Sequence, residues 1–256
     1  MSLFSNLKSE GLEESQDRLG GYQPLDTDIY TGPIKVAYAG KAASGAQSIT
    51  LLLDLNGKEY RETIYITNKQ GQNWFLNKDD KSKKVPLPGF TTIDDICLVT
   101  TGKPLAEQEA EDKVVKIYDP DQKKEMPKSV PVLTELTGKI VSLGIVKNLE
   151  NKSEKNGNGE YVATAETRQT NTIEKVFHTE TKMTVAEARA QKDSPEFWDA
   201  WLERNRHKDR DRREIKDGAG APGKPSAGRQ NAGPPSGNAQ GGAPRQSLFG
   251  AKKTAA

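Results

Sequence analysis

The chain has 256 residues, of which only 33% are hydrophobic, and its mean hydropathy is −0.79. With 23 glycines, 14 prolines and a single cysteine, the composition predicts one ordinary core with long unpacked ends and excludes an internal disulfide. The net charge of +2 combines an acidic body, residues 1–203, with a basic remainder, so binding to a polyanion would require a local basic groove.

The first elements follow from turn residues and apolar spacing. Residues 1–29 are expected to form an N-terminal arm with a short helical piece, and they lack the apolar core of a signal peptide. From Gly32 the apolar period changes to two, which is typical of strands. Residues 47–68 then predict two strands joined by Asn56-Gly57, a pair typical of tight hairpins.

The second strand of this hairpin has two different faces. Tyr60 shares one face with isoleucines, so periodicity favours a core position for it. Tyr65 shares the other face with Arg61 and threonines, which favours exposure. After a polar turn, Trp74 and Phe75 are adjacent, so they cannot both point inward if this segment is a strand.

The middle of the chain predicts a short helix, then a loop, then three further strands. Residues 92–102 suit a short helix with Thr92 as N-cap and Gly102 as its stop. The acidic residues 106–113 are expected to be an exposed loop or fragment. Strands are predicted again in three segments, at residues 113–119, 138–150 and 160–177.

The C-terminal part changes from helix to low complexity. Thr184 and Glu187 form a capping-box pattern, and a second helix is expected from Ser194. After about residue 216 the Gly-, Pro- and Ser-rich composition predicts disorder. We therefore expect three parts: an arm (1–29), a domain with a C-terminal helix (30–215) and a basic tail (216–256).

Motifs for catalysis or metal binding are missing from the sequence. Neither histidine has a partner at metal-ligand spacing, and no phosphate-binding, dinucleotide or hydrolase motif occurs. Two aspartates near residue 120 could suggest a divalent-metal site, but an exposed Asp-Pro turn explains them more simply, and a metal-dependent nuclease would need a carboxylate cluster that the sequence lacks. We expect no enzyme activity, no cofactor, no metal and no membrane span.

About six strands with one or two short helices predict a mainly β chain with an OB-like Greek-key barrel. Such barrels bind single-stranded nucleic acid by combining basic groups with aromatic rings that stack on bases. Many of the lysines are expected to be ordinary solvated surface. The candidate DNA-binding residues are Lys35, Lys58, Arg61, Tyr65, Lys69, Trp74 and Phe75.

The short arm, the stretch "YRETIYITNKQGQNWF" and the Gly/Pro-rich tail resemble single-stranded DNA-binding proteins of tailed bacteriophages, especially the podovirus replication type. The resemblance covers residues 1–215 in layout, and "TNKQGQNWF" is its only local motif. It implies largely sequence-independent single-stranded DNA binding in DNA replication and recombination, in the cytoplasm of the bacterial host cell.

The tail departs from that family because its tip is basic, whereas many relatives end in an acidic tip that recruits partners. We expect it to contact replication, recombination or RNA polymerase proteins through Leu248, Phe249, Lys252 and Lys253. The alternative is a structural or adaptor protein that does not bind nucleic acid.

Overall fold

The computed structural model describes residues 23–119, 122–157 and 160–215. These residues form a mainly β structure with a few short helices. The strands are β1 (Asp28–Lys41), β2 (Gln47–Leu55), β3 (Lys58–Tyr65), β4 (Trp74–Leu76), β5 (Lys84–Pro86), β6 (Ala110–Asp119), β7 (Lys124–Leu133), β8 (Ile140–Lys155), β9 (Tyr161–Phe177) and β10 (Arg210–Asp211). The helices are α1 (Pro88–Thr101), α2 (Val185–Arg189) and α3 (Glu196–Asn205), with 3₁₀ turns η1 (Leu105–Glu107) and η2 (Thr134–Leu136).

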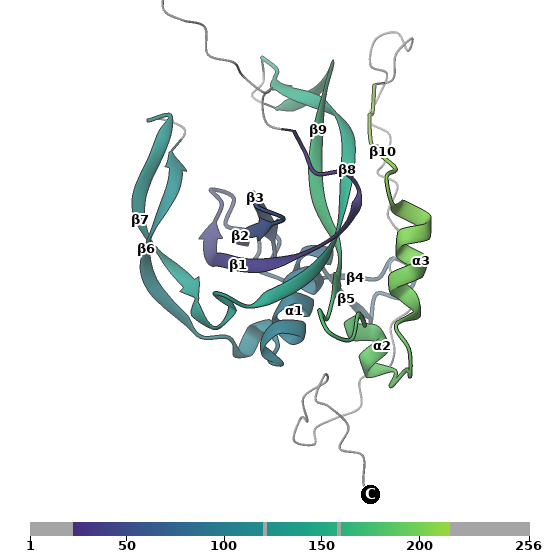
Figure 1. Cartoon of the computed structure of the whole chain (residues 1–256). Coiled ribbons are helices and arrows are strands. Elements are labelled where there is room, and N and C mark those ends of the chain that lie inside the picture. Colours follow the sequence, from purple (N-terminus) through teal and green to yellow (C-terminus); the bar gives the residue numbers. More distant parts are fainter. Residues whose placement is uncertain (1–22, 120–121, 158–159, 216–256) are drawn as a thin grey trace, which may run out of the picture.

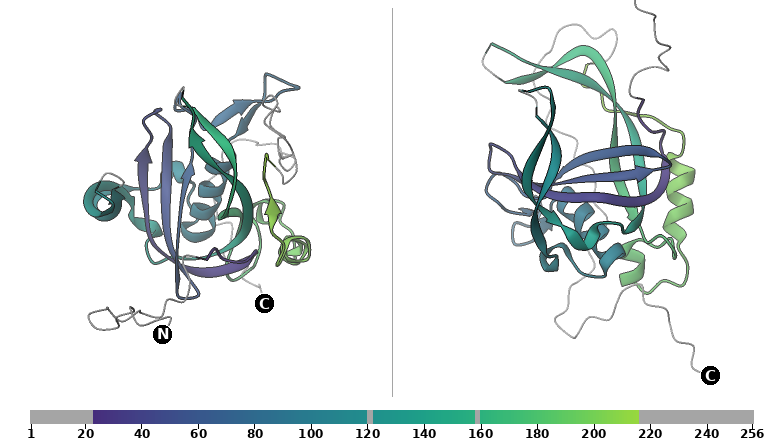
Figure 2. Two further views of the ribbon diagram at one scale, coloured as in Figure 1. Left: turned by 90° about the horizontal axis from the view of Figure 1, so that it is seen from above. Right: turned by 60° about the vertical axis from the view of Figure 1, so that its left-hand side comes forward.

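Five strands make the centre of the main sheet, in the order β3-β2-β1-β8-β9, and all neighbours are antiparallel. The β6–β7 hairpin joins this sheet where Val132 pairs with Tyr38 of β1. Figure 1 shows the β6–β7 and β8–β9 hairpins rising on opposite sides of β1, β2 and β3. Seen from above, α3 and β10 lie along the outer side of the β8–β9 hairpin (Figure 2).

The sheet is not closed into a barrel by backbone pairing. Among the described residues, β3 pairs only with β2, and β9 only with β8. The gap is bridged by Glu62 of β3, whose Oε2 accepts hydrogen bonds from the Tyr60 hydroxyl (2.6 Å) and from the backbone N–H of Ile173 (2.9 Å) in β9. The structure therefore has an open sheet where the sequence predicted a barrel. Helix α1 packs against both β3 and β9, the two strands that do not pair with each other within the described residues.

A sharp bend in β1 lets one strand serve two partners. Its first half pairs with β8 and its second half with β2. Near the bend, a Cβ on Gly32 would lie 1.9 Å from the carbonyl oxygen of Asp54, so only glycine allows this approach. The predicted hairpin turn is confirmed, since Asn56 and Gly57 have φ values of 55° and 77°.

Helix α1 covers one end of the sheet with a fully buried stripe that includes Ile93, Ile96 and Cys97. It begins at Pro88, so the predicted start at Thr92 was wrong; proline is well suited to the first turn because it has no N–H to satisfy. The predicted stop is confirmed, because Gly102 has a left-handed φ of 75°. Burial raises the pKa of the Cys97 thiol to about 12.

The β6–β7 hairpin corrects the expected loop at residues 106–113, because β6 already begins at Ala110. Its partner β7 was not predicted, since Pro127 and Pro131 interrupt the strand pattern. Both prolines are accommodated because, in the described part of the chain, β7 pairs with β6 along its length but with β1 only at Val132, which leaves most of its other edge without a strand partner there.

The C-terminal helices pack on the outside of β8 and β9. The capping box is confirmed: Thr184 Oγ1 accepts from the Glu187 N–H at 3.2 Å, and Glu187 Oε2 accepts from the Thr184 N–H at 2.9 Å. Trp201 of α3 is buried beside Val146 and donates its indole N–H to Glu174 at 3.0 Å. The chain therefore lies against the sheet from α2 to β10, which pairs with β8.

Candidate nucleic-acid interface

Strand β3 separates the predicted DNA-binding residues into two groups. Arg61 and Tyr65 lie on its outer face, where Tyr65 is 53% exposed. Tyr60 is buried on the opposite face, as predicted. Lys58 shares the face of Tyr60 by alternation, so it cannot act on the same surface as Arg61 and Tyr65.

The turn after β3 is organised by one side chain. Asn68 Oδ1 accepts hydrogen bonds from the backbone N–H groups of Gln70 and Gln72, both at 3.0 Å. Gly71 takes a left-handed φ of 77°, and its N–H donates to the Asn68 carbonyl. The polar stretch is thus a defined turn that leaves Lys69 exposed to solvent.

The β4–β5 hairpin follows, and its first strand carries Trp74 and Phe75. Phe75 is 40% exposed, whereas Trp74 is half-buried with the Lys84 ammonium 4.2 Å from its ring centroid. One face of the indole is therefore covered by a cation. After the hairpin, the start of α1 approaches the end of β3, where a Cβ on Gly89 would lie 2.2 Å from the Tyr65 carbonyl oxygen.

We call the exposed aromatic rings and lysines of this segment, together with the half-buried Trp74, the 65–86 surface. It comprises Tyr65, Lys69, Trp74, Phe75, Lys78, Lys81 and Lys84. Among the described residues, no carboxylate lies within ion-pair distance of Lys69, Lys78 or Lys81. Sequence reasoning did not select Lys78, Lys81 and Lys84; the lysine-rich run "KDDKSKK" was the signal that could have found them.

Two other predicted contacts are already occupied within the protein. Lys35 pairs with Asp54 at 3.2 Å, beside the bend in β1. Arg61 Nη2 lies 3.3 Å from Glu125 Oε1 in β7 and 3.8 Å from Glu59. A phosphate would have to compete with these carboxylates for both cations.

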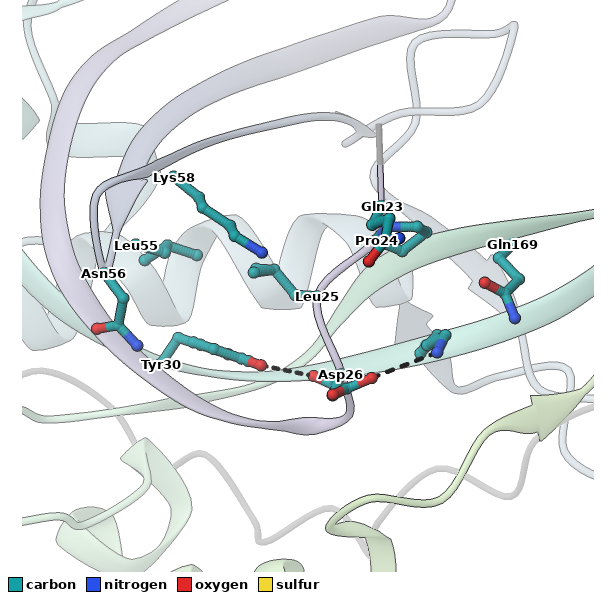
Figure 3. A pocket seen from close by; sticks show the side chains of 10 residues that line it. Gln23, Pro24, Leu25, Asp26, Tyr30, Leu55, Asn56, Lys58 and Gln169 are labelled. Atoms are coloured by element: carbon teal, nitrogen blue, oxygen red, sulfur yellow. Dashed lines mark hydrogen bonds and ion pairs between the residues drawn. The ribbon is translucent and has the colours of Figure 1, made fainter. Parts of the chain in front are cut away.

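Lys58 lines a pocket of about 500 Å³ at the end of β3 opposite the 65–86 surface. Figure 3 shows Lys58 extending across the pocket towards Leu25, with Gln169 of β9 on the far side. Lys147, another lysine of the predicted strands, belongs to the same wall. The remaining lining residues are Gln23, Pro24, Asp26, Tyr30, Leu55 and Asn56.

The described part of the chain holds no group of three or more His, Cys, Asp or Glu side chains that could bind a metal ion. No helix within the same residues is both long and apolar enough to cross a membrane. The predicted partner-binding residues Leu248, Phe249, Lys252 and Lys253 lie outside the described residues, as does the N-terminal arm before residue 23.

Comparison with known proteins gives no assignment: no protein-family model matches the chain, and no curated protein matches it.

Proposed function

We propose that the protein binds single-stranded DNA without enzymatic activity and with little dependence on sequence, and that it serves DNA replication and recombination in a phage-infected bacterial cell. The 65–86 surface supplies rings for stacking and lysines for phosphates. Because every base has a flat face, stacking is tolerant of sequence.

The arrangement of strands agrees with an OB-like domain. The OB-fold is a partly open, five-stranded Greek-key barrel whose strands 2 and 3, with adjacent loops, hold oligonucleotides. Here β1, β2, β3, β8 and β9 take the places of the five strands, and α1 lies between the third and the fourth in the chain. The Glu62 bridge to Ile173 takes the place of backbone pairing between the third and fifth strands.

The observation that most favours single-strand binding is the combination of exposed rings and unpaired lysines on the 65–86 surface. Tyr65 and Phe75 are 53% and 40% exposed, and Lys69, Lys78 and Lys81 have no acidic partner among the described residues. The acidic body offers no general attraction for a polyanion, so a local surface of this kind is needed.

Titration of the whole protein with oligo-dT, followed by tryptophan emission and by fluorescence anisotropy of a labelled oligonucleotide, tests the proposal. We expect saturable binding with quenching of Trp74, and weaker binding in Lys78→Gln/Lys81→Gln. A flat anisotropy curve at low salt, with the native circular dichroism spectrum retained, would rule out single-strand binding.

A second candidate function is that of an adaptor that binds other proteins. It is favoured by apolar side chains on the two long hairpins, where Val114 is 72% exposed and Tyr161 is 71% exposed. The protein would have this function instead if the wild type does not bind oligo-dT and if Val114→Ser or Tyr161→Ser abolishes binding of a protein partner.

A further inference from the structure

The pocket at the β2–β3 turn is preformed, because its N-terminal wall is fixed by hydrogen bonds. The side-chain amide of Asn171 accepts from the Leu25 N–H and donates to the Leu25 carbonyl, both at 2.8 Å. Thr27 Oγ1 donates to the Lys208 carbonyl at 2.7 Å and accepts from the Lys147 N–H at 2.9 Å. The residues before β1 are thus tied to β8, β9 and the chain after α3.

The pocket is lined by apolar, aromatic and amide side chains. Leu25 and Leu55 are buried and form an apolar floor, and the Tyr30 ring is held in place by a 2.9 Å hydrogen bond from its hydroxyl to the Asp26 carbonyl. Gln169 is exposed on β9, with no hydrogen-bond partner for its amide among the described residues. An apolar floor with a fixed ring suits a flat base, and a free amide can pair with base edges.

The charges of the pocket favour an anion at one place. Lys147 is shared by two carboxylates, because its ammonium lies 3.3 Å from Asp26 and 3.7 Å from Asp209, so it has no spare positive charge for a ligand. The Lys58 ammonium has no carboxylate within ion-pair distance in the described part of the chain. Lys58 is therefore the lining cation that is available to an anion, and its side chain extends towards Leu25 of the apolar floor (Figure 3).

We propose that this pocket holds one nucleotide unit, with its phosphate at Lys58, its base over Leu25 and Leu55 beside Tyr30, and a base edge against Gln169. A volume of about 500 Å³ lies within the range of small-ligand sites, roughly 300 to 1,000 Å³. The inference rests on the proposed function, in that the unit comes from a bound single strand; a free nucleotide presents the same chemistry. The pocket is separate from the 65–86 surface because Lys58 and Tyr65 are at opposite ends and on opposite faces of β3.

Thymidine 5′-monophosphate is the direct probe, added to the ¹⁵N-labelled whole protein with thymidine as the control ligand. We expect saturable amide shifts at residues 55–58 and 169, weaker with thymidine because it lacks the phosphate. Lys58→Gln and Gln169→Ala should each weaken monophosphate binding about fivefold or more, while Lys116→Gln, which removes the same charge from β6, should not. Gln169→Ala changes an exposed side chain, so we expect this variant to fold and its loss of binding to be interpretable.

Oligo-dT separates this inference from the proposed function. Shifts at the pocket and at the 65–86 surface, with excess monophosphate reversing only those of the pocket, support both. If Lys58→Gln and Gln169→Ala leave oligo-dT affinity unchanged, the proposed nucleotide site in the pocket is wrong, but the proposed function is not affected. If the protein binds the monophosphate but not oligo-dT, the nucleotide site is supported and the proposed single-strand binding is contradicted. No shift at residues 55–58 with either ligand overturns the pocket.

Discussion

Arg61 on β3 and Glu125 on β7 form an ion pair across 3.3 Å, although they are 64 residues apart. The pair joins the outer face of β3 to the β6–β7 hairpin. It also places a carboxylate beside a cation that the sequence assigns to phosphate binding.

We expect Glu125→Gln to strengthen oligo-dT binding about two- to fivefold at low salt, because it removes the nearer of the two carboxylates beside Arg61 and a charge that repels phosphate. Arg61→Gln should weaken binding. Anisotropy titrations measure both effects. Glu111→Gln is the matched control, since Glu111 is on the same hairpin and pairs with Lys113 instead. Equal gains from both glutamate variants would mean that only the net charge matters.

Removal of rings from the 65–86 surface tests stacking. Tyr65→Ala and Trp74→Ala should each weaken oligo-dT binding by about 1 to 3 kcal/mol, or roughly 5- to 150-fold, for a lost base contact. We expect the smaller effect at Trp74, because Lys84 covers one face of its ring. Tyr161→Ala is the control, as Tyr161 is 71% exposed on another hairpin. A loss there as large as that of Tyr65→Ala would place the site on the β8–β9 hairpin.

The salt dependence should reveal how many phosphates are bound. If Lys69, Lys78 and Lys81 each contact one phosphate, the logarithm of affinity should fall against the logarithm of salt concentration with a slope of about −2, at about −0.7 per contact. Lys78→Gln/Lys81→Gln should make the slope shallower by about 1.4. Titrations over a range of sodium chloride concentrations measure it. An unchanged slope in the double variant would exclude both lysines from the phosphate contacts.

Asp95 on α1 makes stability depend on pH. Burial raises the pKa of its carboxyl group to about 6, against the opposing effects of Lys175 and Arg189. The folded protein therefore binds this proton more tightly than the unfolded chain, so the associated stability is complete below about pH 4 and is lost as the pH rises through about 6. Asp95→Asn should raise the free energy of unfolding at pH 7.5 by on the order of 2 kcal/mol, with little change at pH 4.

Urea unfolding of wild type and variant at the two pH values measures this difference. Asp79→Asn, at an exposed loop position, is the control and should have little effect at either pH. An Asp95→Asn variant that is less stable than wild type at pH 7.5 would contradict the burial of an ionised carboxylate.

Deletion of residues 245–256, which lie outside the described part of the structure, tests the tail. We expect oligo-dT affinity to stay within about threefold at physiological salt, because only three basic residues are lost and salt screens contacts of single charges with DNA. Stimulation of, or pull-down with, a replication, recombination or transcription protein should be lost, since Leu248 and Phe249 are removed with Lys252 and Lys253. A truncated chain that binds DNA tenfold more weakly but keeps its partners would assign the tail to DNA.

Features that depend on neighbours in the chain could be predicted from the sequence. The turn at Asn56-Gly57, the stop of α1 at Gly102 and the capping box of Thr184 each require particular residues within a few positions. The burial of Tyr60 and the exposure of Tyr65 follow from strand alternation in the same way.

Features that depend on distant partners were decided by the tertiary structure. Strand β7 forms despite two prolines because β6 supplies its partner along one edge. The side-chain roles of Arg61 and Lys58 were not readable from their strand, since Glu125 and the pocket wall come from other elements. Packing brings Lys147 to Asp26 across 121 residues of sequence, and local periodicity contains no information about which charges such packing will pair.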